Sequence, residues 1–209
     1  MKRKWMVWPL ALGLALTLAA CKGSDPKEAL VGTWSAQVDV MEQVVEGMRL
    51  TAPEIADELE MESFNIPLVM EFREDDTYTL SVNQEQLDQT MDELIQKAVD
   101  ATMAYMEQAL KDQGITDMTV DEALAQSGMD RGSFTELMKQ SMGTLSTTMA
   151  QQIQTEGQYR VDEEKLYTSN STDLKPDDGE STPYTLDKDS LTMDFNDVEI
   201  GEVTFTRGG

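Results

Sequence analysis

Short stretches of alternating apolar and polar residues occur in two parts of the chain. The first part holds three of them, at residues 34–40, 68–72 and 78–82, and the last two flank an acidic turn at residues 74–76. Alternation with a period of two is typical of β-strands that bury one face. Residues 68–82 are therefore predicted to form a β-hairpin.

The same alternation returns after residue 156. Five further strands are predicted there, separated by acidic turns and loops: residues 157–161, 165–169, 183–186, 191–195 and 202–207. The total is eight short strands in succession. Antiparallel strands in that number suit an up-and-down barrel, which closes on itself and leaves no exposed edge.

A helical periodicity separates the two groups of strands, from about residue 84 to residue 154. Two Ser/Thr-x-x-Glu capping boxes, beginning at Thr119 and Ser133, predict helix starts, and Gly114 and Gly157 are expected helix ends. Apolar residues recur there at steps of three and four, as in amphipathic helices. They are Leu87, Met91, Leu94, Ala98, Tyr105 and Ala109 in the first helix, and Phe134, Leu137, Met138, Met142, Leu145, Met149 and Ile153 in the last.

A shorter helix is predicted between the first two strands, because Thr51 and Glu54 form a capping box around Pro53. The predicted fold class is therefore α+β. Residues 32–83 and 156–209 are expected to form an eight-stranded antiparallel β-barrel. Residues 84–155 are expected to form a helical hairpin inserted between strands 3 and 4.

The first twenty residues have the pattern of a bacterial export signal. Lys2, Arg3 and Lys4 precede an apolar run that ends in Leu18-Ala19-Ala20-Cys21. This ending resembles the lipobox of bacterial lipoproteins, which implies cleavage before Cys21 and lipidation of its thiol. Residues 1–20 are then a signal peptide and residues 21–31 a tether. The resemblance implies a protein held by its lipid on the extracytoplasmic side of a membrane. An ordinary secretory signal and an uncleaved anchor are the alternatives.

Composition narrows the function classes. The formal net charge is −24, and removal of the signal leaves 13 basic residues against 40 acidic, a net charge of −27. So acidic a surface argues against nucleic acid as a partner, because phosphate backbones require Lys and Arg. The chain has no His and a single Cys, so it forms no internal disulfide and lacks the usual general base.

Motifs for catalysis or metal binding are missing from the sequence. There is no Gly-x-Ser-x-Gly elbow and no phosphate-binding glycine loop. The acidic residues 177–180 lack the spacing of a calcium loop, and a solvated acidic surface explains them. We therefore expect no enzyme, no cofactor and no metal site.

The strand termini resemble those of the lipocalin family. Gly32-Thr33-Trp34 opens the first strand, and the last strand ends at Arg207. The hairpin segments around residues 72–78, 157–167 and 184–191 are similar to those of bacterial lipocalin-like lipoproteins. The resemblance implies that Arg207 stacks on Trp34 at the floor of a barrel. Residues 119–142 also resemble, more faintly, the helical arms of trigger-factor-type chaperones.

Two groups of side chains are candidate site residues. The first group comprises the aromatic residues whose strand parity points inward, which would either fill the barrel or line a ligand pocket: Trp34, Phe72, Tyr78, Tyr159, Tyr184, Phe195 and Phe205. The second group comprises methionines of the insertion, which would either pack the helices together or form an adaptable apolar surface: Met91, Met103, Met106, Met138, Met142 and Met149.

Two functions remain open at this point. In the first, the barrel binds an apolar or amphipathic small molecule and the helical insertion acts as a lid. In the second, the barrel is a filled scaffold, and the methionine-rich helices bind another exported protein, as a chaperone-like module does. Fold alone does not decide between them.

Overall fold

The structure is a computed structural model of the chain. It describes residues 25–162, 164–177, 181–195 and 201–208. The predicted signal peptide and the predicted lipidation site, Cys21, lie outside the described residues. Within those ranges, no helix is both long enough and apolar enough to cross a bilayer.

Eight antiparallel strands form a closed barrel in which each strand pairs with its neighbours in sequence. The last strand completes the circle by pairing with the first, where Arg207 lies opposite Trp34. The prediction of an α+β fold with an eight-stranded antiparallel barrel is confirmed. The strands are β1 (Gly32–Asp39), β2 (Asn65–Phe72), β3 (Thr77–Val82), β4 (Thr155–Asp162), β5 (Lys165–Thr168), β6 (Thr182–Asp187), β7 (Ser190–Phe195) and β8 (Gly201–Arg207).

The alternating pattern of the sequence determines which face of each strand is buried. In β1, Trp34, Ala36 and Val38 are buried and the residues between them are exposed. The β2–β3 hairpin turns at residues 74–76, where the Asp75 carboxylate accepts hydrogen bonds from the backbone N–H and the hydroxyl of Thr77. Asp76 takes the positive φ of 67° that the turn needs.

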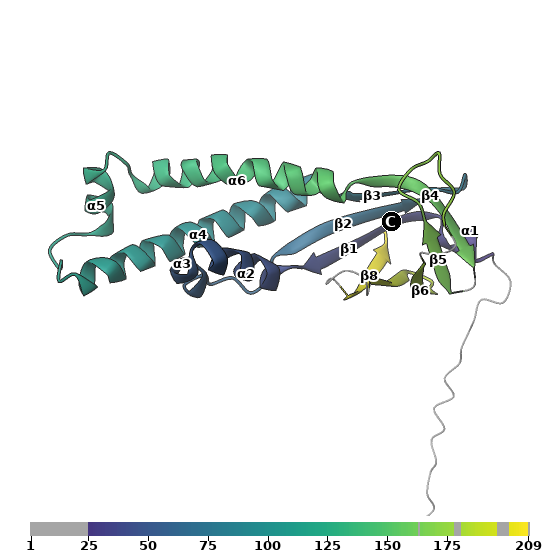
Figure 1. The fold of residues 1–209 in the computed structure, drawn as a ribbon, viewed down its shortest axis with the longest axis horizontal. Coiled ribbons are helices and arrows are strands. Elements are labelled where there is room, and N and C mark those ends of the chain that lie inside the picture. The colour runs from purple at the N-terminus through teal and green to yellow at the C-terminus, as the bar shows by residue number, and fades with distance from the viewer. Residues whose placement is uncertain (1–24, 163, 178–180, 196–200, 209) are drawn as a thin grey trace, which may run out of the picture.

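The helical arm consists of α4 (Gln84–Asp112), α5 (Val120–Gln126) and α6 (Arg131–Ile153), which follow β3 and precede β4 in chain order. Helices α4 and α6 lie side by side and extend away from the barrel along the long axis of the molecule (Figure 1). The 29 residues of α4 give it a length of about 43 Å. The short helix α5 lies at the far tip.

Three expected helix boundaries are wrong. Helix α6 begins at Arg131, because the Asp130 carboxylate accepts from the backbone N–H of Ser133, and no capping box forms at Ser133. The same helix ends at Ile153, and Gly157 belongs to β4. Thr51 does not cap a helix but is the last residue of α2 (Met41–Thr51), which the pattern did not predict.

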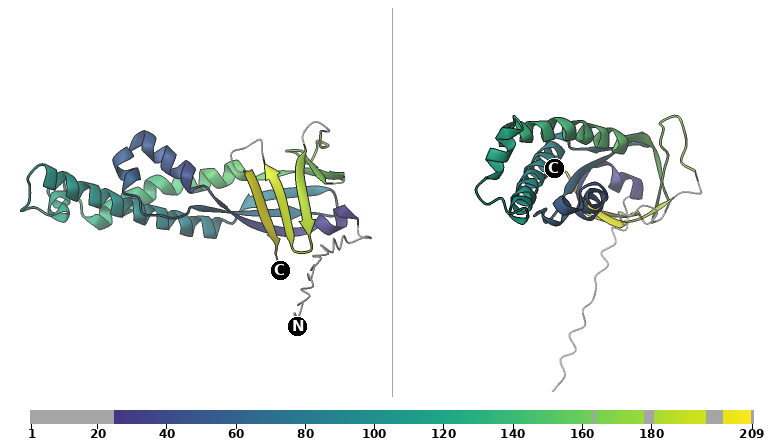
Figure 2. Two further views of the ribbon diagram at one scale, coloured as in Figure 1. Left: turned by 90° about the horizontal axis from the view of Figure 1, so that it is seen from below. Right: turned by 60° about the vertical axis from the view of Figure 1, so that its left-hand side comes forward.

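Helix α3 (Pro53–Asp57) follows α2 directly and contacts α4 near the base of the arm. Helices α2 and α3 lie beside α4 beyond the end of β1, where the arm leaves the barrel, and the first half of α4 contacts β2 (Figures 1 and 2). Leu87, Met91 and Leu94 of α4 belong to the same hydrophobic core as the barrel residues. The core therefore continues from the barrel into the arm.

The opposite end of the barrel is covered by α1 (Pro26–Leu30), whose Leu30 is fully buried. This helix corrects the expected tether of residues 21–31, because its last residue packs in the core next to the barrel. The Asp25 carboxylate, which caps the helix by accepting from the Lys27 backbone N–H, and the burial of Leu30 explain the difference.

Candidate functional site

The inward-facing aromatic residues lie in the core. Phe72 packs against Tyr78 with ring centroids 6.2 Å apart, and against Tyr159 edge to face at 4.9 Å. The structure buries Trp34, Tyr184 and Phe205 as well and leaves Phe195 partly buried at its margin. Packed rings of this kind fill the interior of a small barrel. The structure thus brings the predicted lining residues together as one packed cluster.

The two deeply placed tyrosines donate hydrogen bonds to backbone carbonyls. The Tyr78 hydroxyl donates to the Ser169 carbonyl at 3.1 Å, and the Tyr159 hydroxyl donates to the Arg73 carbonyl at 3.0 Å. Burial, together with the nearby carboxylates of Asp76 and Asp75, raises the pKa of Tyr159 to about 12. A phenol held neutral in this way is a structural group at neutral pH.

The raised pKa of Tyr159 predicts a loss of stability at alkaline pH. The unfolded chain releases this proton at about pH 10, whereas the folded chain keeps it up to about 12. The contribution of Tyr159 to stability is therefore complete below pH 10 and is lost as the pH rises toward 12. Urea unfolding at several pH values should show this decline in the free energy of unfolding. In Tyr159→Phe, the slope of that free energy against pH should be smaller. The exposed Tyr105→Phe serves as control, and equal slopes in all three proteins would contradict the assignment.

The floor of the barrel is held by Trp34 and Arg207. The Arg207 guanidinium lies over the Trp34 ring, 4.1 Å from its centroid, and donates to the backbone carbonyls of Val31 and Ala29. The Trp34 indole N–H donates to the Leu30 carbonyl at 2.8 Å. The stacking is the one that the family resemblance implied. Sequence reasoning did not anticipate the three hydrogen bonds that accompany it, which end on backbone carbonyls of α1 and of Val31.

Gly32 is needed for this contact. A Cβ atom at Gly32 would lie 2.9 Å from an Arg207 guanidinium nitrogen, and φ is +133°, where L side chains are rarely found. The glycine of the Gly-Thr-Trp motif therefore makes room for the arginine. The motif is explained by the structure of the barrel floor without any ligand.

Most methionines of the arm pack the helices together. Met91 and Met103 are buried, and Met106, Met138, Met142 and Met149 are partly buried against the hydrophobic core. Polar contacts align the same helices: the Ser146 hydroxyl donates to Asp88 at 3.0 Å, and Lys139 pairs with Asp92 at 3.2 Å. The expected methionine face is thus largely packed against the hydrophobic core, and of these six residues only Met103 also lines a cleft at the tip of the arm.

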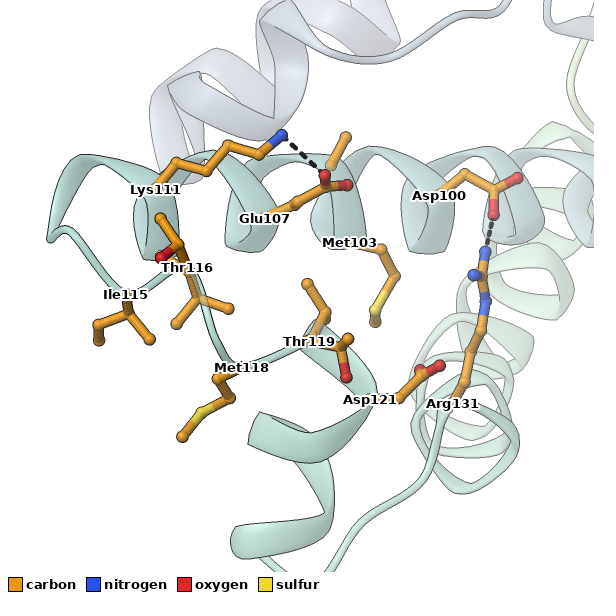
Figure 3. A pocket seen from close by; sticks show the side chains of 13 residues that line it. Asp100, Met103, Glu107, Lys111, Ile115, Thr116, Met118, Thr119, Asp121 and Arg131 are labelled. Carbon is orange, nitrogen blue, oxygen red and sulfur yellow. Dashed lines mark hydrogen bonds and ion pairs between the residues drawn. The ribbon is translucent and has the colours of Figure 1, made fainter.

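A cleft of about 650 Å³ lies at the tip of the arm, between α4, the segment leading to α5, and the start of α6 (Figure 3). We call it the tip cleft. Met103 points from α4 toward the segment that carries Met118 and Thr119. A volume of this size is within the range of protein ligand pockets. Its apolar lining consists of Met103, Ala104, Leu110, Ile115, Met118 and Val120.

Local signals in the sequence shape the tip cleft. Gly114, at a φ of +73°, lets the chain leave α4, and the Ile115 N–H then bonds back to the Leu110 carbonyl at 2.9 Å. The predicted capping box of Thr119 and Glu122 is present and starts α5. Sequence reasoning placed these stops and starts but did not recognise Ile115 and Met118 as a lining.

The charges around the tip cleft are predominantly negative. Arg131 pairs with Asp100, and Lys111 pairs with Glu107 at 2.7 Å. Residues 100–122 carry four further carboxylates, those of Asp112, Asp117, Asp121 and Glu122, for which no ion pair is found in the described structure. Hydrogen bonds from Thr119 lower the pKa of Glu122, which keeps it ionised. Across the described ranges, no three His, Cys, Asp or Glu side chains converge as a metal site requires.

Comparisons of the chain with protein-family models, with curated proteins and with solved structures gave no match.

Proposed function

We propose that this chain is a lipid-anchored protein of the bacterial cell envelope whose helical arm binds another exported protein. In this proposal the barrel is a filled scaffold and catalyses no reaction. One observation carries the proposal: the aromatic residues of the barrel pack against one another, whereas a cleft with both apolar and charged lining residues lies at the tip of the projecting arm.

The covered ends of the barrel support the scaffold role. Leu30 of α1 is buried at the floor, and Leu87 and Leu94 of α4 are buried at the opposite end. A small ligand would have to displace one of these packed groups to reach the interior. The alternative, in which the barrel carries an apolar small molecule beneath a helical lid, requires such a displacement.

The floor contacts support the lipocalin-like assignment, which remains a proposal. The glycine, tryptophan and arginine that suggested it lie together at the floor, with Arg207 over the Trp34 ring. A closed barrel of eight antiparallel strands is also the architecture that the resemblance implies. These features concern the scaffold only and assign no ligand to it.

The proposed anchor would orient the arm. If Cys21 is lipidated, the segment from Cys21 to Pro26 spans at most about 18 Å, so the barrel floor stays close to the bilayer. Helix α1 and the arm tip lie at opposite ends of the molecule (Figure 1). If the long axis of the molecule is perpendicular to the membrane, the barrel lies between the membrane and the arm. The tip cleft would then lie beyond the barrel by about the length of α4, 43 Å.

A truncated arm tests the proposed function. Because Arg131 pairs with Asp100, residues 101–130 can be replaced by a short glycine-rich loop that joins α4 to α6. The variant removes α5 and the tip cleft but keeps the part of α4 that seals the barrel. We expect it to remain folded by circular dichroism and to lose the ability to delay aggregation of a denatured client protein.

Photo-cross-linking in cells provides the matched readout. A photoreactive amino acid at Thr116, on the rim of the tip cleft, should form cross-links to exported proteins. The same amino acid at the exposed Thr185 on the outside of the barrel should form none. Cross-links of equal strength at both positions would contradict an arm-specific function. A ligand mass retained by residues 22–209 in native mass spectrometry would favour the small-molecule alternative.

A further inference from the structure

We propose that the tip cleft selects cationic amphipathic polypeptide segments, in which apolar side chains are flanked by Lys or Arg. This inference rests on the proposed function, because it names the class of partner that the arm would bind. It follows from two independent properties of the tip cleft: the chemistry of its lining and the charge of its rim.

The lining favours apolar side chains of varied shape. Met103 from α4 and Met118 from the segment before α5 line the cleft with flexible thioethers, and Ile115 and Val120 line it as well. Unbranched methionine side chains adapt to different partners at little cost. The cleft therefore suits leucine, isoleucine or phenylalanine side chains without requiring one particular shape.

The rim favours positive charge. Both cations that border the tip cleft, Lys111 and Arg131, already pair with acidic residues of α4. Asp121, which lines the tip cleft, and Asp117, which precedes Met118 in the sequence and is exposed, thus present carboxylates that neither cation neutralises. Complementary charge on the partner increases its association rate and excludes acidic segments by repulsion. An anionic lipid surface or a nucleic acid would be repelled in the same way.

The two properties together explain why the partner is a polypeptide. A cationic detergent would bring one apolar tail and one charge, so it would meet only one of the carboxylates near a cleft of about 650 Å³. A segment with several apolar side chains and flanking Lys residues fills the lining and meets the rim simultaneously. Such segments are buried in folded proteins when amphipathic helices pack, so they are exposed in exported chains before folding.

The test uses fluorescence anisotropy with residues 22–209 and synthetic amphipathic peptides. The first peptide combines leucine with lysine. In the second, glutamate replaces lysine, and in the third, serine replaces leucine. We expect the leucine–lysine peptide to bind, and the other two to bind at least about tenfold more weakly. Binding should weaken with added salt, because the rim charges are exposed.

Paired substitutions locate the binding surface. Met118→Ser should weaken binding of the leucine–lysine peptide by about tenfold, because it removes the apolar contact that the half-buried Met118 thioether would make with the peptide. The double variant Asp117→Asn, Asp121→Asn should weaken it by about threefold and reduce its salt dependence. The matched controls are Leu137→Ser, at a side chain 54% exposed on α6, and Asp173→Asn, at an exposed loop residue. Both controls should bind as the unchanged chain does.

The outcomes separate this inference from the proposed function. Equal binding of the lysine and glutamate peptides, or equal weakening by Met118→Ser and Leu137→Ser, would overturn the inference. If Thr116 still formed cross-links in cells, the arm would remain a protein-binding element with a different preference. Unchanged peptide binding by the chain that lacks residues 101–130 would show attraction to the acidic surface in general and would also overturn the inference. Absence of cross-links at Thr116 with cleft-dependent peptide binding would instead contradict the proposed function alone.

Discussion

Replacing Gly157 by alanine is expected to destabilise the barrel by about 3 kcal/mol or more, within the upper range for overpacked interiors. The backbone of β4 passes so close to the end of β5 that a Cβ atom at Gly157 would lie 1.8 Å from the Ser169 carbonyl oxygen. It would also lie 3.1 Å from the Tyr78 ring. Because the first clash is with backbone, a rotamer change cannot relieve it.

The consequences of that clash extend beyond the two strands in contact. The Ser169 carbonyl accepts the hydrogen bond of the Tyr78 hydroxyl, and the Ser169 backbone N–H donates to Gln158 at 2.9 Å. Moving Ser169 away would weaken both interactions and would loosen the aromatic packing of Tyr78 against Phe72. A bulkier substitution, Gly157→Val, is therefore expected to prevent folding of the barrel.

Gly143 on α6 provides the matched control for Gly157→Ala. A Cβ atom there would meet nothing within 4 Å beyond the neighbouring residues and backbone of its own helix, and the residue lies inside that helix. Gly143→Ala should stabilise the arm by about 0.5–1 kcal/mol, because alanine restricts the unfolded chain and favours the helix. Chemical denaturation of both variants measures whether each substitution lowers or raises the free energy of unfolding. Equal small effects at the two positions would show that β4 and β5 can separate without cost.

The strands could be predicted because the residues that decide which face of a strand is buried are close together in the sequence. Trp34, Ala36 and Val38 alternate with polar residues, and this alternation alone determines which face is buried. Closure of the barrel follows from the number of strands and the short acidic turns. Helix α2 could not be predicted in this way, because it has no side-chain cap and starts where the Asp39 carboxylate accepts from Met41 and from the distant Phe64.

The tip cleft was harder to predict than the elements that form it. The sequence shows the end of α4 at Gly114 and the start of α5 at Thr119, and both are present in the structure. Whether Met118 points into a cleft or into solvent depends on how the connection folds back on α4, which no local pattern encodes. Similarly, a periodic pattern marks Met138 and Met142 as apolar but does not state whether they face a partner or a neighbouring helix.

Arg207→Ala is expected to reduce the free energy of unfolding by about 2–4 kcal/mol, from the lost bonds of a charged donor and a lost cation–π contact. Arg207 ties the last strand to the first part of the chain, because its guanidinium donates to Val31 and Ala29 while covering the Trp34 ring. Without it, the carbonyl of Val31 loses its donor at 2.9 Å, and α1 is held at the floor mainly by Trp34 and by the ion pair of Lys27 with Asp76.

The fluorescence of Trp34 makes this prediction specific to the floor. Trp34 is the only tryptophan after the predicted signal peptide, so its emission reports on the floor alone. Arg207→Ala should shift the emission to longer wavelength as water reaches the ring, and Arg207→Lys should restore the charge but not the divergent pair of hydrogen bonds. We therefore expect the lysine variant to recover only part of the stability. If both variants left emission and unfolding unchanged, Arg207 would not hold α1 against the barrel, and the floor could open to admit a ligand.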